Sequence, residues 1–135
     1  MEGKFLTKLI IQGELFRVYV WNDIIKMNAY EEECKKKYMA FPERYKIEED
    51  NPYGSDGFIA PTEKEIHLMG EPLYDEEQLL RNLAHEVAHA IFCCKDKWDF
   101  YKDEKIVEAC AETYAEIYKC VNNVRKDIES RKTHA

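Results

Sequence analysis

The sequence predicts an α+β fold, because two β-hairpin patterns stand beside three helical patterns in a chain of 135 residues. Residues 5–11 and 14–21 are rich in β-branched and aromatic residues and are separated by Gln12-Gly13, a pair that favours a tight turn. Residues 57–60 and 65–69 repeat this pattern on either side of a short turn that begins with proline. We therefore expect two β-hairpins, separated along the chain by a helical segment.

Apolar residues recur at helical spacing in three segments, which we expect to form helices at about 24–39, 75–95 and 103–130. Asparagine or aspartate precedes the first two segments and can cap their N-termini. Residues 42–56 contain charges, two prolines and several turn-forming residues, which predicts a loop near the functional site. The polar tail at 131–135 is expected to fray.

The core faces of the two longer helices can be assigned by placing successive residues 100° apart. On the second helix, the predicted core face comprises Leu80, Leu83, Ala84, Val87, Ile91 and Cys94. On the last helix, it comprises Val107, Cys110, Tyr114, Tyr118 and Val121. We expect both stripes to pack against the rest of the protein.

The composition is that of a soluble globular protein, with 45% hydrophobic and 13% aromatic residues. At this length we expect residues 1–135 to form a single domain with its own core. The net charge of −7 disfavours a nucleic-acid partner, and no apolar run is long enough for a membrane span. The five cysteines are odd in number and form no CxxC pair, so we expect reduced thiols in a cytoplasmic protein.

The main functional motif is His85-Glu86-Val87-Ala88-His89, an HExxH sequence within the helix expected at 75–95. Residues i and i+4 lie one turn apart on nearly the same side of a helix, so the two imidazoles can bind one zinc ion together. Glu86 is then placed to take a proton from the attacking water as a general base. We expect His85 and His89 to be metal ligands and Glu86 to be catalytic, whereas His67 is expected to be structural or exposed.

A catalytic zinc site needs a third protein ligand. The metzincin continuation HExxHxxGxxH is excluded, because Phe92 stands at the glycine position and Lys95 at that of the third histidine. Carboxylates on the next helix are the remaining source, and Glu108 and Glu112 lie one turn apart there.

Glu108 follows His89 by 19 residues, which resembles the gluzincin arrangement of an HExxH motif with a glutamate ligand on the following helix. In that group an acid one turn later often holds a ligand histidine in place without binding the metal, and Glu112 matches this position. The assignment can also shift by one turn, with Glu112 as the ligand and Glu116 as the supporting acid. We expect Glu108 to be the third ligand.

Residues 57–122 resemble the small phage and bacterial metallopeptidases of the ImmA/IrrE and SprT-like group. The match rests on the strand at 65–69, the acid-started helix, the sequence Leu83-Ala84-His85-Glu86-Val87-Ala88-His89-Ala90-Ile91, and Glu108 on the next helix. The resemblance implies a minimal zincin-like fold, in which a short antiparallel sheet packs on the active-site helix beside a long C-terminal helix. It also implies that an edge strand pairs with an extended substrate.

These observations predict a zinc-dependent metallopeptidase that hydrolyses peptide bonds in a peptide or protein substrate. A tyrosine that stabilises the oxyanion is expected, and Tyr53, Tyr101 and Tyr114 are the candidates. Two alternatives remain, namely another zinc hydrolase such as a deformylase or amidase, and a non-proteolytic zincin-scaffold protein that binds a host protein. The intact Glu86 favours an enzyme, because a binding protein needs no base beside the metal.

Overall fold

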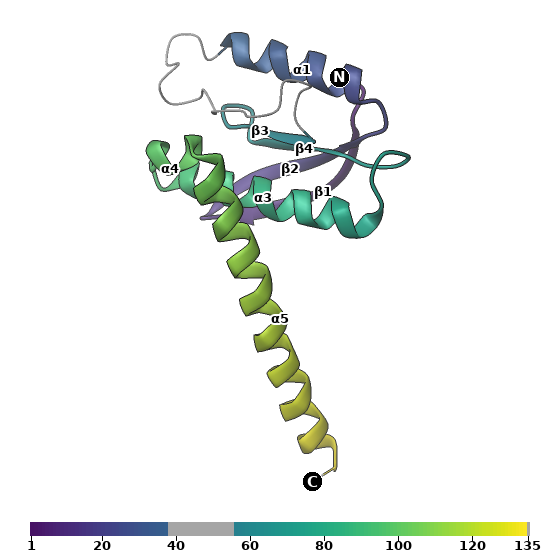
Figure 1. Ribbon diagram of the computed structural model, residues 1–135, viewed down its shortest axis with the longest axis vertical. Helices are drawn as coiled ribbons and strands as arrows, with labels where there is room; N and C mark the ends of the chain where they lie inside the picture. Colours follow the sequence, from purple (N-terminus) through teal and green to yellow (C-terminus); the bar gives the residue numbers. More distant parts are fainter. Residues whose placement is uncertain (38–55, 135) are drawn as a thin grey trace.

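The computed structural model describes residues 1–37 and 56–134, which form a small sheet between helices and one long helix that leaves the body (Figure 1). The elements follow in the order β1 (Lys4–Ile11), β2 (Glu14–Trp21), α1 (Ile24–Lys37), β3 (Gly57–Ala60), β4 (Glu65–Met69), α3 (Glu76–Cys94), α4 (Trp98–Lys102) and α5 (Glu104–His134). The α+β class and both hairpins are confirmed. Most of the predicted loop at 42–56, including Tyr53, lies outside the described residues.

The four strands form one sheet in the order β1-β2-β4-β3. β1 and β2 pair antiparallel across Gln12 and Gly13, which both have positive φ, as a tight hairpin turn requires. β3 and β4 also pair antiparallel, whereas β2 and β4 run parallel, with Trp21 opposite Met69. The expectation of a purely antiparallel sheet is therefore wrong at its central pair. The chain crosses over through α1 between β2 and β4, and a parallel pair needs such a crossover.

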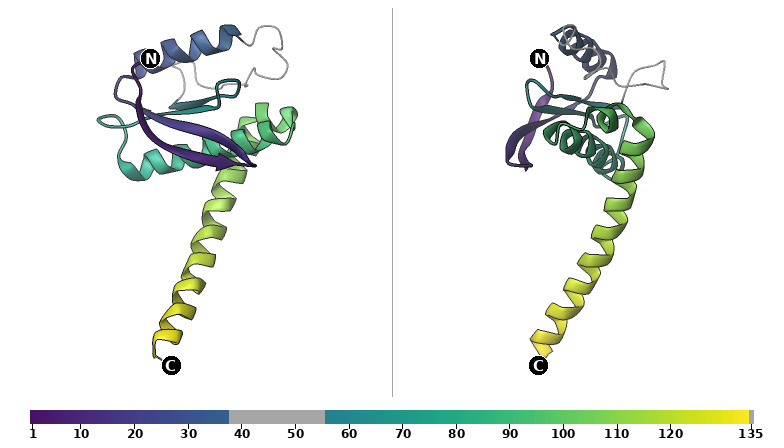
Figure 2. Two further views of the ribbon diagram at one scale, coloured as in Figure 1. Left: turned by 180° about the vertical axis from the view of Figure 1, so that it is seen from behind. Right: turned by 90° about the vertical axis from the view of Figure 1, so that its left-hand side faces the viewer.

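Helices cover both faces of the sheet, with α1 on one side and α3 on the other (Figure 2). Successive strand residues point to opposite faces, so β2, β3 and β4 each contribute to two cores. Ile66 and Leu68 of β4 join the core against α3. Met69 of β4 and Phe58 of β3 join the core against Met27 of α1. β4 is therefore buried on both faces from Ile66 to Met69, so a polar residue there needs a partner.

α3 is buried on two sides rather than on one predicted face. Glu86, Ala88, His89 and Ala90 are its buried residues, whereas Leu80 on the predicted core face is 54% exposed. The sheet covers one side of α3, and α4 and α5 cover the side that carries the histidines. The face of α3 that carries the histidines thus forms the floor of a site between α3, α4 and α5.

α5 packs on the body only near its start, where Val107 and Ala111 are buried together with Ala88 of α3. From residue 112 to 132 its side chains are exposed, Asn122 being half-buried. The predicted core stripe is therefore wrong beyond Val107, because the helix outruns the body. The polar tail, where fraying is expected, belongs to the helix as far as His134. None of the described helices is long and apolar enough to cross a membrane.

Candidate metal centre

α3 presents both histidines of the HExxH motif to the same side. Asp75 caps its N-terminus by accepting a hydrogen bond from the Gln78 backbone N–H at 2.9 Å, as the sequence predicts. His85 and His89 lie one turn apart, and their ring centroids are 4.9 Å apart. His89 is 1% exposed, whereas the His85 side chain opens slightly to solvent. The pair therefore forms the inner wall of a site that solvent reaches at His85.

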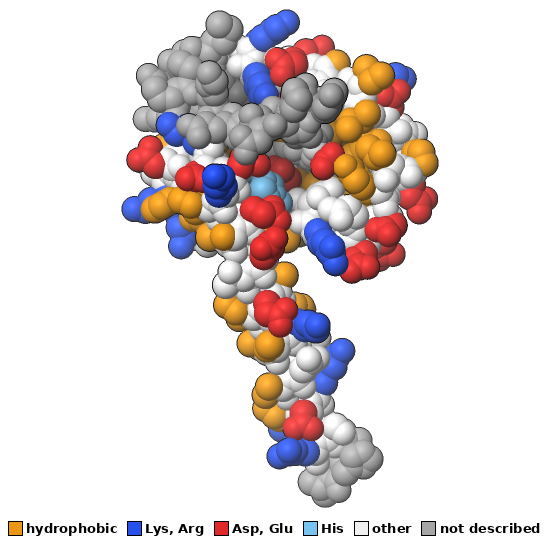
Figure 3. Space-filling view, viewed as in Figure 1, with side chains coloured by type: hydrophobic (Ala, Val, Ile, Leu, Met, Phe, Trp, Pro, Cys, Tyr) orange, Lys and Arg blue, Asp and Glu red, His pale blue; other side chains and the backbone are white. Residues whose placement is uncertain are grey.

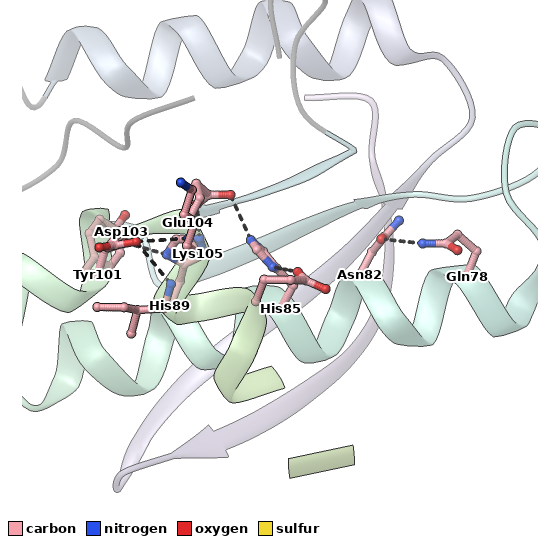
Figure 4. Close-up of polar contacts among 10 residues, drawn as sticks. Gln78, Asn82, His85, His89, Tyr101, Asp103, Glu104 and Lys105 are labelled. Atoms are coloured by element: carbon pink, nitrogen blue, oxygen red, sulfur yellow. Dashed lines mark hydrogen bonds and ion pairs between the residues drawn. The ribbon is translucent and has the colours of Figure 1, made fainter. Parts of the chain in front are cut away.

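The chain turns back over these histidines through α4 and begins α5 beside them. Tyr101 of α4 is buried in the core and fixes this connection. Asp103 then caps α5 by accepting hydrogen bonds from the backbone N–H groups of Lys105 and Ile106, both at 3.1 Å. Glu104, the first residue of α5, is thereby placed directly above the imidazoles (Figure 4).

Glu104 is the carboxylate that meets both imidazoles. Its Oε1 lies 2.7 Å from His89 Nε2, and its Oε2 lies 3.1 Å from His85 Nε2. One ligand atom from each of these three residues lies within 4.8 Å of the other two. Among the described residues, these three side chains form a group whose geometry could hold a metal ion.

The opposite ring nitrogens are held by acceptors outside this group. His89 Nδ1 lies 2.8 Å from the Tyr101 carbonyl oxygen, and His85 Nδ1 contacts Glu108 Oε2. Metal-binding histidines commonly donate their second N–H to a carbonyl or carboxylate, which fixes the ring and directs the other nitrogen to the metal. Both rings are thus oriented with Nε2 toward Glu104.

The α5 acids that lie beside the two histidines are one turn nearer the N-terminus than expected. Glu104, which the sequence analysis missed, occupies the place expected for Glu108. Glu108 in turn holds a histidine, the role expected for Glu112. Glu112 lines the cleft, and within the described chain it forms no hydrogen bond or ion pair with either histidine. Glu104 lies four residues before Glu108, just as Glu112 lies four residues after it. This regular spacing of acids could have identified Glu104 as a candidate ligand.

The charges in this group stabilise one another. Burial opposes ionisation of Glu104, but its hydrogen bonds with His85 and His89 outweigh burial and lower its pKa to about 2. Burial likewise lowers the pKa of His85, but the hydrogen bond with Glu104 and the charge of Glu86 outweigh it and raise that pKa to about 9. The acids therefore supply the negative charge that a bound cation requires.

Glu86 lies at the junction of α3 and the edge strand β3. It is buried and lines the same cleft as the histidines. A Cβ atom added at Gly57 of β3 would lie 3.6 Å from Glu86 Cγ and only 2.9 Å from the His67 carbonyl oxygen. The absence of a side chain thus lets Gly57 pair closely with the backbone of β4, next to the Glu86 side chain.

These residues lie in a cleft of about 1030 Å³ between α3, α5 and β3. Histidine is visible at the surface there, with acidic side chains around it (Figure 3). α5 contributes Glu108, Glu112 and Glu116 to the cleft, and β3 contributes Gly57 and Phe58. Of the two tyrosines in the described chain expected to stabilise an oxyanion, Tyr101 is buried behind His89 and Tyr114 is exposed on α5. Neither tyrosine lines the cleft.

The chain matches no protein-family model, no curated protein and no solved structure.

Proposed function

We propose that the protein is a zinc-dependent hydrolase of peptide bonds with a zincin-like fold. The observation that carries this proposal is the convergence of His85 Nε2, His89 Nε2 and the Glu104 carboxylate in an open cleft. Glu86 beside them supplies a base at the position that the HExxH motif assigns to it.

The donor set fits zinc better than the common hard cations. Zinc binds imidazole nitrogen and carboxylate oxygen, and its catalytic sites combine three protein ligands with one open position. Magnesium and calcium prefer sites made of oxygen atoms alone. Here two of the three donors are imidazole nitrogens, whose rings are already oriented by Tyr101 and Glu108.

The roles of the residues follow from their positions. Bound zinc would polarise the scissile carbonyl and make water more acidic. Glu86 takes a proton from the attacking water and delivers it to the leaving amine. Glu108 holds His85, and the Tyr101 carbonyl holds His89, so that both keep their orientation during turnover.

A peptide substrate is favoured by the strand that borders the cleft. β3 is an edge strand in the order of the described sheet, and its Gly57 and Phe58 line the cleft. An edge strand presents unpaired backbone N–H and C=O groups, to which an extended peptide can add as a further strand. The substrate backbone would then run past Glu86 and the ligand group.

The sharpest test separates metal binding from turnover by replacing Glu86 with glutamine. Glu86→Gln keeps the side-chain size but cannot accept the proton, so we expect a folded, zinc-loaded protein with about 10² to 10⁴-fold lower cleavage rate. The measurement is a substrate-profiling digest with the zinc-loaded parent, followed by rates on an identified substrate. Glu116→Gln, which alters another acid of the cleft, is the matched control and should cleave at the parental rate.

Two results would contradict the proposal. Cleavage by Glu86→Gln at the parental rate would exclude Glu86 as the base. If the zinc-loaded parent cuts no peptide or protein, including those of a host lysate, a binding protein built on the same scaffold replaces the enzyme.

A further inference from the structure

The distal part of α5 carries an apolar stripe that the body does not cover. The helix has 31 residues, and it extends away from the body in every view (Figures 1 and 2). Hydrophobic side chains gather along one side of this extension (Figure 3). The six large apolar residues of the stripe are 48 to 66% exposed, namely Tyr114, Ile117, Tyr118, Val121, Val124 and Ile128.

This stripe follows a seven-residue repeat, which is the pattern of helices that wind around each other. If Val107 is position a, positions a and d are Val107, Cys110, Tyr114, Ile117, Val121, Val124, Ile128 and Arg131. Positions b, c and f from residue 112 to 130 are Glu112, Ala115, Glu116, Lys119, Asn122, Asn123, Lys126, Glu129 and Ser130. Every large apolar residue of this stretch therefore lies at a or d, apart from Tyr118 at e. A strict seven-residue spacing favours a left-handed supercoil with another helix over a straight surface helix.

The stripe and the metal cleft lie on different sides of α5. The cleft is lined, from residue 112 onward, by Glu112, Ala115, Glu116 and Lys119, which occupy positions b, c and f. None of the exposed stripe residues lines it. A helix bound along positions a and d would therefore leave the cleft accessible.

We propose that two copies of the chain associate through this stripe as a parallel two-stranded coiled coil. The charged residues at positions e and g, beside the stripe, favour a second copy of the chain in parallel orientation as the partner. From residue 112 to 132, positions e are Tyr118, Arg125 and Lys132, and positions g are Thr113, Cys120 and Asp127. In a parallel pair, Asp127, which also forms an ion pair at 3.2 Å with Arg131 of its own helix, faces Lys132 of the other copy. An antiparallel pair would place positions e against e and g against g, which separates Asp127 from Lys132. A second copy supplies both the matching apolar stripe and the opposite charge.

The oligomeric state is measured by light scattering on the full chain over a concentration series. We expect a mass twice the 16.1 kDa of one chain for the parent. Val121→Lys places a charge in the centre of the stripe and should give the mass of one chain. Asn123→Lys adds the same charge at exposed position c and should remain a dimer.

Three outcomes would overturn the association. These are a parent that stays monomeric at its highest soluble concentration, a mass of three chains, and a dimer that survives Val121→Lys. Binding of a monomeric parent to phosphatidylcholine vesicles would instead assign the stripe to a lipid surface.

The orientation is tested by cysteine cross-linking in a Cys110→Ser/Cys120→Ser background. Arg131→Cys lies at position d near the end of the helix, so two copies meet there only in a parallel pair. We expect rapid oxidation of this variant to a covalent dimer. Lys126→Cys at the outward position f is the control and should cross-link slowly. Equal rates, or a dimer in which Arg131→Cys fails to cross-link, would exclude the parallel arrangement.

Discussion

Two histidine sites in this protein show how differently burial can be used. His67 lies on β4, on the side of the sheet that faces α1, and its ring is stacked between its cross-strand neighbours Tyr19 and Phe58. His85 and His89 lie on α3, on the other side of the sheet, among carboxylates. Both sites are largely enclosed, yet only the second directs ring nitrogens to a common point.

The partners of the ring nitrogens explain the difference. Trp21 Nε1 donates a hydrogen bond to His67 Nδ1 at 2.9 Å, and His67 Nε2 lies 3.1 Å from Glu65 Oε1. Both nitrogens are used within the core, and burial lowers the pKa of His67. At the α3 site, acids raise the pKa of His85 to about 9 despite the opposing effect of burial. A histidine count alone thus says little, because the surrounding acceptors decide whether a ring is structural or available to a cation.

The largest expected effect separates the two sites by metal content. We expect about one zinc ion per chain in the parent after purification without chelator, and background zinc in His85→Ala/His89→Ala. His67→Phe should keep the metal, because His67 belongs to the other core. Elemental analysis of the three proteins decides the matter, and stoichiometric zinc in the double variant would refute the assignment.

The next effect ranks the acids of α5. Glu104→Gln should weaken zinc most, because it removes one of three ligands. Glu108→Gln removes only the group that holds His85, and such changes typically cost about 10 to 100-fold in affinity. Glu112→Gln should match the parent. Competition with a chelator measures the three affinities, and a larger loss for Glu108→Gln than for Glu104→Gln would restore the register expected from the sequence.

The sequence was sufficient for the local elements and for the α3 part of the site. Turn-forming pairs and capping residues such as Asp75 act over a few neighbours, so the hairpins and the start of α3 could be predicted. The parallel pairing of β2 and β4 depends on where α1 packs, which is a long-range property. The choice of Glu104 depends on how α4 folds back after Lys95, and helical spacing alone cannot distinguish acids one turn apart.

A smaller effect concerns the stability of the aromatic core. His67→Phe keeps a ring between Tyr19 and Phe58 but leaves the buried Trp21 N–H without its acceptor, which should cost about 1 to 3 kcal/mol in unfolding free energy. Urea titration of the parent, His67→Phe, Trp21→Phe and the double variant gives the coupling between the two residues. Strictly additive effects would show that the hydrogen bond contributes nothing.

The smallest effect is in the pH dependence of that stability. Because the folded-state pKa of His67 is lowered, the unfolded chain binds the proton more readily. The contribution of neutral His67 is therefore complete above its unfolded pKa of about 6.5 and is lost as the pH falls toward the folded value. We expect the parent to lose stability more steeply than His67→Phe over this range in urea titrations at several pH values. Parallel curves would contradict the assignment, since the titration of His85 is common to both proteins.

The position of Glu104 at the very start of α5 makes the centre tolerant of bending and sensitive to twisting. The helix is about 45 Å long and packs on the body through Val107 and Ala111, so a bend beyond Ala111 moves its far end while Glu104 stays in place. Rotation about the helix axis instead carries Glu104 and Glu108 sideways together, away from the two imidazoles that they contact. A bend of the exposed part of α5 therefore leaves both carboxylates in place, whereas a rotation of the whole helix about its axis would displace them.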